Sequence, residues 1–534
     1  MKIIKISLLV LMLLAASVTC GVSGKINNSR AKTESTAPEM LGVDPQAIKK
    51  FIEELNSVPE TDIHHVVIAR KNSIIAEGDF GPFAKNEVHT LYSCSKTFTM
   101  LAIGMLVDDD KLSVDDKVID LLPDKAPAEK SDALKAMTVK HLLTMCAGIE
   151  PSLTLWQESD DWAKSWLAQP VTRLGDFQYD SLCTFMLSSI VQRITGKTLL
   201  EFLNERFFHP LGIYEADWEE SPDGINVGGW GLRLTAESMA IAGICIMHKG
   251  KWGDKQLVSE KWIEEASQAH TNYKHPDPKP TDTNQGYCYQ MWRCLQPGAF
   301  RADGAYGQFI VMSSEHDLVV VITGVSHNTG KELACIWNYL IPGVNEIHAP
   351  VYDSAGQQMM RELPPPMDVS QHLRLILSIP RNDIDSIKLE LGPNARSYRT
   401  MSIEFSEKDY GISTDYFCRM KIVRDDGTIV EYPFLFNDWA KRTTTQAPPY
   451  NNAVGPVDMR EIKGLKGEYN TAGTCYWLSD NKLVLKIYWT NWIVCNTFTI
   501  DFHEDGTATI TNDEGYPCCE PEIINATYES SAKI

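Results

Sequence analysis

Residues 91–98 of the 534-residue chain read LYSCSKTF, and this stretch decides how the rest of the sequence is interpreted. In it, Ser93 is followed three residues later by Lys96. Three residues make nearly one helical turn, so a helix would place the Lys96 amine beside the Ser93 hydroxyl, which it could activate as a nucleophile. The apolar run that follows, through Leu106, predicts a long buried helix. The stretch therefore predicts an activated serine at the start of a core helix.

The same Ser-x-x-Lys spacing also occurs at residues 29–32 and 530–533, near the two ends of the chain, where chains commonly fray. Only Ser93 follows a predicted hairpin and opens a strongly apolar helix. A serine at a helix N-terminus also lies near a free backbone N–H that could bind an oxyanion. The competing interpretation is that Ser93 merely caps the helix.

The hydrophobic pattern on either side predicts strands at both ends of a domain and helices between them. The terminal strand pairs are hairpins, so we expect an α/β domain whose sheet is largely antiparallel. The expected helices are 45–55, 93–106, 139–145 and 184–195, and the expected strands are 65–69, 73–77, 308–313 and 318–324.

The order of the motifs resembles the superfamily of serine β-lactamases, penicillin-binding proteins and related esterases, and most of all its class C-like branch. The resemblance implies a β-lactamase-like three-layer fold with a helical subdomain, and a serine hydrolase activity. It spans roughly residues 40–340, and after LYSCSKTF it is carried by 109–116 (DDKLSVDD), 138–145 (TVKHLLTM), 195–198 (TGKT), 207–213 (FFHPLGI), 228–232 (GGWGL) and 301–308 (RADGAYGQ).

The resemblance implies a set of catalytic groups around Ser93. The second family motif, Tyr-x-Asn, falls on Tyr179, whose phenol could form a proton relay with Lys96. Which of the two takes the proton first stays open. Ser181 replaces the amide of that motif at a substrate-binding position. The backbone N–H groups of Ser93 and Ala305 would form the oxyanion hole.

The third family motif is altered in this sequence. It falls on Ala302, Asp303 and Gly304, with Gly307 three residues further on, and Asp303 and the two glycines are expected to line the substrate site. The usual cation at the first position is missing. In the family that cation helps to recognise a carboxylate, so its loss argues against a dedicated β-lactamase. A second candidate, residues 328–330 (NTG), also lacks the lysine and ranks below.

Charge and the N-terminal residues bear on where the protein acts. With 70 acidic and 50 basic residues the net charge is −20, which disfavours nucleic acids and anionic membranes as partners. Residues 1–24 read as a signal peptide, with a positive start and a short apolar core. We expect an exported bacterial protein, periplasmic or at the cell surface. Lipidation of Cys20 and ordinary cleavage nearby both stay open, and lipidation would be the only link to a membrane.

The predicted domains are the signal peptide at 1–24, a hydrolase domain at 25–345, a linker at 346–367 and a separate all-β domain at 368–534. Period-two alternation predicts the β domain. Its tryptophans, Trp477, Trp489 and Trp492, could line a ligand cleft, although large aromatic residues in a small β domain are more often core.

The functional hypothesis is an exported serine hydrolase that acts on a small ester, amide or peptide-like substrate through an acyl-enzyme on Ser93. Three alternatives stay open. One is an acyltransferase that uses the same residues, one is a catalytically silent penicillin-binding-like sensor, and one is a chain whose β domain does the binding. The chemistry needs only side chains, so neither a metal nor a cofactor is expected. No Cys or His spacing indicates a zinc site.

Overall fold

The fold is described from a computed structural model of the chain. It describes residues 34–534 except 60, 152–158, 272–280, 346–363, 373–380, 382, 407–416, 446–447, 449–463, 466–467, 517–518 and 533. The predicted signal peptide, Cys20 and most of the predicted linker therefore lie outside the described residues. Within the described part of the chain, no helix is both long and apolar enough to cross a membrane.

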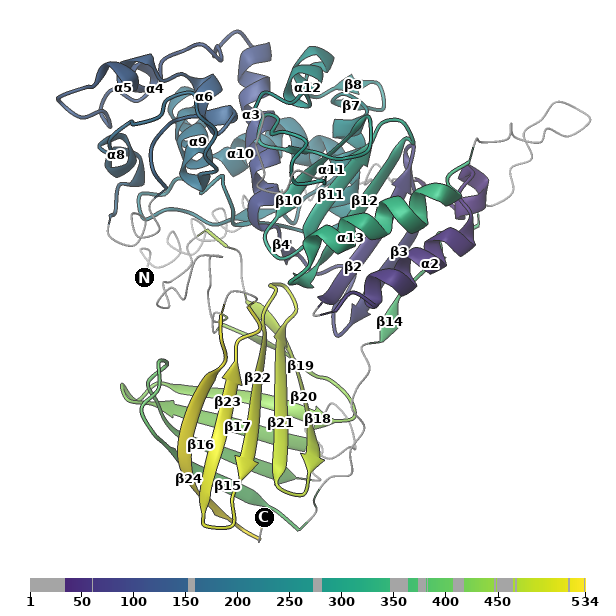
Figure 1. Ribbon diagram of the computed structural model, residues 1–534, viewed down its shortest axis with the longest axis vertical. Helices are drawn as coiled ribbons and strands as arrows, with labels where there is room; N and C mark the ends of the chain where they lie inside the picture. Colours follow the sequence, from purple (N-terminus) through teal and green to yellow (C-terminus); the bar gives the residue numbers. More distant parts are fainter. Residues whose placement is uncertain are drawn as a thin grey trace, which may run out of the picture. The chain divides into compact units, whose positions relative to one another are not determined.

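The first domain is built on a mostly antiparallel sheet (Figure 1). Its strands are β1 (Glu34–Ser35), β2 (Thr61–Arg70), β3 (Ser73–Gly81), β9 (Trp292–Arg293), β10 (Ala299–Gly304), β11 (Gln308–Ser313), β12 (Leu318–Ser326), β13 (Met367–Asp368) and β14 (Gln371–His372). The order across the sheet is β1-β3-β2-β12-β11-β10-β9, and β13 and β14 both pair with β3. Pairing with β3 is parallel for β1, β13 and β14, and the other pairs are antiparallel. The chain thus stays on this sheet beyond residue 367, where the linker was expected to end.

Both faces of the sheet are buried, which makes three layers. Along β2, Val66 and Ile68 join the core on one face, while Val67 and Ala69 join the core on the other. This is the alternation that a strand with two apolar neighbours requires. On the first face lie α2 (Pro45–Asn56) and α13 (Thr329–Cys335) (Figure 1).

The opposite face packs against α11 and the helical subdomain. The helices of this layer are α3 (Ser95–Asp108), α4 (Val118–Leu121), α5 (Asp132–Ala136), α6 (Val139–Leu143), α8 (Trp162–Leu167), α9 (Ser181–Thr195), α10 (Leu199–Leu203), α11 (Ala236–Met247) and α12 (Glu260–Ala266). Short strands β4 (His89–Thr90), β5 (Asp217–Trp218) and β6 (Leu232–Leu234) form a small second sheet. β7 (Lys251–Trp252) and β8 (Lys255–Gln256) form a hairpin.

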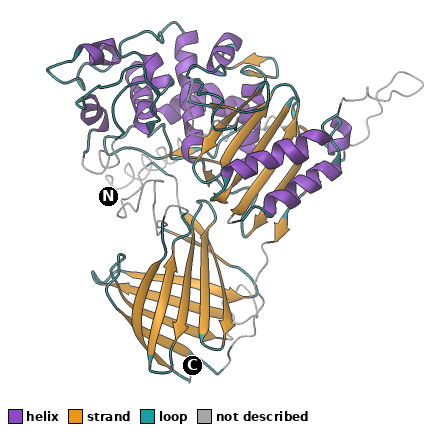
Figure 2. Cartoon of the chain, viewed as in Figure 1, coloured by secondary structure: helices purple, strands orange, loops and turns teal. Residues whose placement is uncertain are grey.

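The last part of the described chain is all-β (Figure 2). Its strands are β15 (Ser386–Leu391), β16 (Tyr398–Ser406), β17 (Phe417–Arg424), β18 (Ile429–Phe436), β19 (Ala440–Thr444), β20 (Tyr469–Ser479), β21 (Lys482–Trp489), β22 (Cys495–Phe502), β23 (Thr507–Asp513) and β24 (Glu522–Ser530). Neighbouring strands are antiparallel, and a parallel pairing of β18 with β20 closes the sheet into a barrel. The predicted fold class, a β-lactamase-like domain plus a separate all-β domain, is confirmed.

The three tryptophans of the barrel lie in its hydrophobic core. Trp477, Trp489 and Trp492 are at most 8% exposed and belong to one apolar cluster with residues from most of the strands. Of the two interpretations offered by the sequence, the structure favours core packing.

Candidate active site

The nucleophile candidate lies in a tight turn that joins β4 to α3. Tyr92–Cys94 form a 3₁₀ turn and α3 begins only at Ser95, so Ser93 precedes the helix and does not cap it. Cys94 is the N-cap, and its side chain makes no capping hydrogen bond to the first turn of the helix. Tyr92 has a φ of 46°, a left-handed backbone that a bulky residue rarely adopts. Strain of this kind is characteristic of backbone that is held for a function.

Strand β10 runs alongside this turn. The Cys94 thiol donates to the carbonyl of Gln308 at 3.1 Å. A Cβ added at Gly304 would lie 2.3 Å from the Leu91 carbonyl oxygen, so only glycine allows this approach. The structure therefore brings the predicted third motif next to the predicted nucleophile, although about 210 residues separate them.

Lys96 is the best-defined group of the site. Its side chain is 1% exposed, and its Nζ lies 2.8 Å from Ser93 Oγ, 3.0 Å from Ser181 Oγ and 2.7 Å from the Gly229 carbonyl oxygen. As an ammonium group Lys96 would donate to all three. As a neutral amine it has two N–H groups for Gly229 and Ser181 and a lone pair that accepts from the Ser93 hydroxyl. The three partners thus suit both protonation states.

Burial determines the protonation of Lys96. It lowers the pKa of Lys96 to about 7, against the opposing effect of the Asp180 carboxylate. An amine with such a pKa is partly neutral at physiological pH and can act as a general base.

Tyr179 lies against the same two residues. Its ring centroid is 4.8 Å from Lys96 Nζ, and its phenol is close enough to Ser93 for the serine to act on the pKa of the phenol. Burial raises the pKa of Tyr179 above its ordinary value, with the Ser93 hydrogen bond acting in the opposite direction. Of the two groups left open by the sequence, the raised pKa of the phenol and the lowered pKa of the amine favour Lys96 as the group that accepts the first proton.

Ser181, which was expected at the substrate, contacts the Lys96 amine. It is the first residue of α9, whose N-cap is Asp180 with Oδ1 accepting from the Leu182 N–H at 2.9 Å. The other oxygen of Asp180 accepts from the Trp166 indole at 2.9 Å. The sequence did not single out Asp180 or the Gly229 carbonyl, although both lie in or beside stretches that carry the family resemblance.

The third motif keeps its strand position but carries a different charge. Ala302 is 1% exposed and places no cation in the site. Asp303 Oδ2 accepts from Arg301 Nε at 2.8 Å, so residues 301 and 303 share one face of β10, as alternation requires.

The turn after β10 holds the remaining predicted residues. Ala305 follows Gly304 directly, and its carbonyl accepts from the Gln308 amide at 3.1 Å. That amide also donates to the Gly324 carbonyl at 2.7 Å, which fixes the turn to β12. Gly307 has a φ of 94°, and a Cβ there would lie 2.5 Å from Glu332 Oε2. Gly307 thus packs against α13, and the contacts around it are structural.

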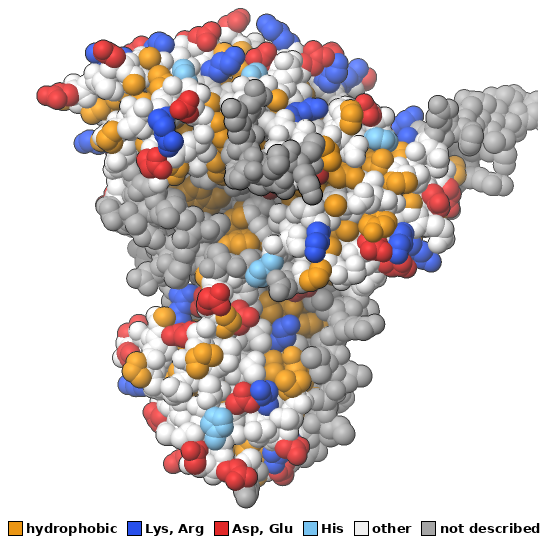
Figure 3. Space-filling view, in the orientation of Figure 1, with side chains coloured by type: hydrophobic (Ala, Val, Ile, Leu, Met, Phe, Trp, Pro, Cys, Tyr) orange, Lys and Arg blue, Asp and Glu red, His pale blue; other side chains and the backbone are white. Residues whose placement is uncertain are grey.

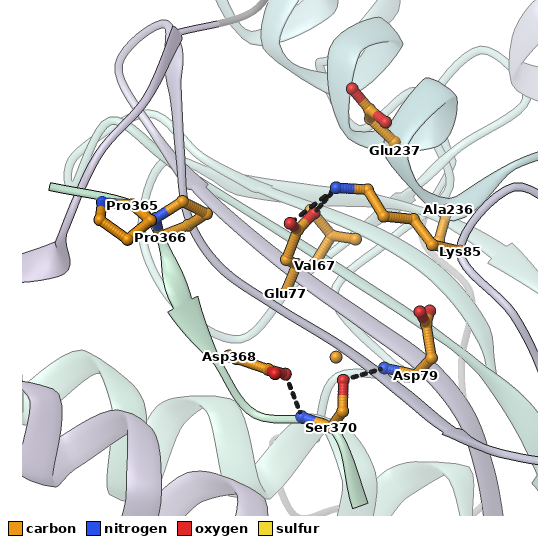
Figure 4. A pocket seen from close by; sticks show the side chains of 11 residues that line it. Val67, Glu77, Asp79, Lys85, Ala236, Glu237, Pro365, Pro366, Asp368 and Ser370 are labelled. Carbon is orange, nitrogen blue, oxygen red and sulfur yellow. Dashed lines mark hydrogen bonds and ion pairs between the residues drawn. The ribbon is translucent and has the colours of Figure 1, made fainter. Parts of the chain in front are cut away.

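Two further features lie away from Ser93. A hollow of about 300 Å³ opens beside β3 and is lined by Val67, Glu77, Gly78, Asp79, Lys85, Ala236, Glu237, Pro365, Pro366, Asp368 and Ser370, none of them a predicted site residue (Figure 4). On the face shown in Figure 3, acidic and basic side chains are interspersed.

Among the described residues, no group of three or more His, Cys, Asp or Glu side chains could hold a metal ion.

Comparison with known proteins shows the family to which the chain belongs. The family model described as Beta-lactamase matches residues 63–340 of the 534, and the chain therefore belongs to the Beta-lactamase family of serine hydrolases and penicillin-binding proteins. That family match confirms the resemblance on which the site residues were assigned.

Curated and solved relatives are distant. The 6-aminohexanoate-dimer hydrolase of Paenarthrobacter ureafaciens is 23% identical over 287 residues, which are 49% of this chain and 72% of that protein. The lovastatin esterase of Penicillium rubens is 26% identical over 175 residues, 27% of this chain and 43% of that protein. Among solved structures, a putative 6-aminohexanoate-dimer hydrolase from Bacillus anthracis has a TM-score of 0.47 at 19% identity, covering 58% of this chain and 87% of that one.

Proposed function

We propose that the protein is an exported serine hydrolase that cleaves an ester or amide through an acyl-enzyme on Ser93. The observation that carries the proposal is the buried Lys96 amine, 2.8 Å from Ser93 Oγ and with a pKa lowered to about 7. A surface lysine at the same spacing would be fully protonated and could not accept the serine proton.

The steps follow from the positions of the groups. Neutral Lys96 removes the proton of Ser93 as Oγ attacks the carbonyl carbon, and backbone N–H groups at Ser93 and Ala305 stabilise the negative charge on the oxygen. The Tyr179 phenol donates a proton to the leaving alcohol or amine and regains one from Lys96. Water then attacks the acyl-enzyme with the same residues acting in reverse, and releases the acid.

Two relatives support the proposed bond types. One is named as a 6-aminohexanoate-dimer hydrolase, which supports an amide substrate, and the other as a lovastatin esterase, which supports an ester substrate. Export is supported by the sequence of residues 1–24 alone. Ala302 in place of a cation leaves β-lactam turnover without support.

Steady-state and pre-steady-state kinetics with p-nitrophenyl esters test the proposal. A burst of p-nitrophenol equal to the enzyme concentration, followed by slower turnover, is expected for an acyl-enzyme. Ser93→Ala should abolish both phases. Turnover that accelerates with an added alcohol, together with ester formation, would instead identify an acyltransferase. A single burst without turnover would identify a sensor.

A further inference from the structure

The ion pair between Arg301 and Asp303 presents its negative end to solvent. The Arg301 side chain is 2% exposed and that of Asp303 is 27% exposed. The guanidinium also donates from Nη1 to the backbone carbonyls of Asp282 at 2.9 Å and Arg293 at 3.0 Å. Its donors are therefore directed inward. A carboxylate has about four acceptor positions, and the Nε bond from Arg301 occupies one of them.

A cluster of aromatic side chains lies near the Asp303 carboxylate. Trp292 on β9 is the cross-strand partner of Arg301, and its ring packs against the core cluster on the helical side of the sheet. Asp303 lies two positions along β10 from Arg301, and its carboxylate acts electrostatically on the Tyr179 and Tyr287 phenols. The Trp292 ring stacks on Tyr179 with centroids 5.9 Å apart and an interplanar angle of 25°. Tyr287 packs edge-on against Trp292, with centroids 4.8 Å apart.

This combination lies within electrostatic range of the reacting groups. The Asp303 carboxylate acts on Lys96 and on the Tyr179 phenol. Gly304, the next residue of β10, is packed against the Leu91 carbonyl at the base of the Ser93 turn. A substrate bound at Ser93 would therefore lie within electrostatic range of Asp303 and near the Tyr179 ring, on which Trp292 stacks.

A carboxylate beside aromatic rings recognises cations, because both the negative charge and the ring faces attract an ammonium group. We propose that Asp303 and Trp292 bind an amine or quaternary ammonium group on the substrate, close to the carbonyl that Ser93 attacks. The inference rests on the proposed function, since it names the substrate class of the same site. The alternative is that Asp303 serves only as the counter-ion of Arg301, and it predicts no preference for substrate charge.

A charge series on the unmodified protein separates the two. The substrates are three p-nitrophenyl esters with acyl chains of similar length: trimethylammonio-butyrate, its carbon isostere with a tert-butyl end, and glutarate with a free carboxylate. The cationic ester should have a kcat/KM about tenfold or more above that of the neutral isostere, with the glutarate the poorest. Equal kcat/KM values across the series would overturn the inference and leave the proposed function standing.

Two variants test whether the preference for the cationic ester arises from Asp303. In Asp303→Asn the ratio of cationic to neutral kcat/KM should fall to about one, because the amide keeps the shape and loses the charge. The ratio is read from a single preparation, so partial loss of folded protein does not affect it. Glu237→Gln, which removes a negative charge beside the hollow at β3, is the matched control and should keep the wild-type ratio. If both variants lowered the ratio equally, general electrostatics would explain it and the assignment to Asp303 would be wrong.

If no ester is turned over, the proposed function fails. Binding of a cationic solute then tests the cation site by itself. Quenching of intrinsic tryptophan fluorescence by butyltrimethylammonium, but not by an equal concentration of tert-butyl alcohol, should be seen in the wild type and be lost in Trp292→Leu. No difference between the two solutes would overturn the cation site independently of catalysis.

Discussion

The Nζ atom of Lys96 lies 2.7 Å from the carbonyl oxygen of Gly229, 133 residues further along the chain. This contact fixes the amine together with the contacts to Ser93 and Ser181. Gly229 can approach only because it lacks a side chain, since an added Cβ would lie 2.6 Å from the Ser181 carbonyl oxygen. Ser181 is itself a partner of Lys96, so one backbone contact positions two of the three groups around the amine.

Gly229→Ala should therefore reduce catalysis by moving Ser181 or the Gly229 carbonyl away from Lys96. We expect kcat/KM to fall by about tenfold or more, as misplacing a catalytic group commonly does. The control is Gly330→Ala in α13, where nothing lies within 4 Å of the added Cβ. That variant should keep wild-type kinetics and gain roughly 0.5 kcal/mol of stability from the better helix propensity of alanine. Equal kinetic losses in both variants would contradict the account.

The pH profile of kcat/KM should report the titration of Lys96. Its pKa is lowered to about 7, and only the neutral amine accepts the Ser93 proton. Activity should therefore rise with pH, be half-maximal near pH 7 and level off above it. Lys96→Arg, whose guanidinium stays protonated, should lose about a hundred- to ten-thousandfold in activity and this pH limb with it. A profile with no limb near pH 7 in the wild type would exclude Lys96 as the base.

Tyr179→Phe should discriminate between leaving groups. The phenylalanine ring can keep the stacking on Trp292, whereas the proton donor is lost. An aliphatic alcohol or amine needs that proton to leave, while p-nitrophenol departs as a stable anion. The variant should lose about a hundredfold or more on an ethyl ester or an anilide and much less on a p-nitrophenyl ester. Equal losses on all these substrates would show that Tyr179 only holds the site together.

Stability should depend on a buried histidine in β2. Burial lowers the pKa of His65 to about 4, from 6.5 when solvated. The unfolded chain therefore binds one more proton than the folded one between about pH 4 and 6.5, so this histidine lowers stability as the pH falls through that window and has no effect above it. His65→Asn can retain a hydrogen bond to Thr323, which lies 2.8 Å from His65 Nδ1. Its stability should depend on pH less steeply than the wild type by about 1.4 kcal/mol per pH unit, measured by urea unfolding at a series of pH values. Parallel slopes would show that His65 is not buried in the neutral form.

Sequence reasoning could propose those candidate groups that short motifs indicate. Ser93 and Lys96 lie one turn apart, and Tyr179 and the Asp303-Gly304 pair follow in the family order, so each could be placed without coordinates. The beginning of α3 was wrong by two residues, because the left-handed backbone at Tyr92 adds a 3₁₀ turn that periodicity does not reveal. The predicted end of α9 at Thr195 is correct, and the structure shows that Gly196 caps it with a left-handed backbone.

The contacts that complete the site could not be predicted. Ser181 was expected to face the substrate, and its position on Lys96 depends on how α9 packs against α3. The Gly229 carbonyl carries no side-chain signal at all. In the β domain, the alternation of apolar and polar residues predicted strands. It did not predict which strands pair, so the parallel pairing of β18 with β20 that closes the barrel could not be foreseen.

The central claim is that Ser93 is an activated nucleophile, and a fluorophosphonate tests it most directly. Intact mass after brief exposure, followed by peptide mapping, should show a single adduct on Ser93. The adduct should be absent in Ser93→Ala and form much more slowly in Lys96→Ala. An unmodified protein, or label spread over surface residues, would contradict the account.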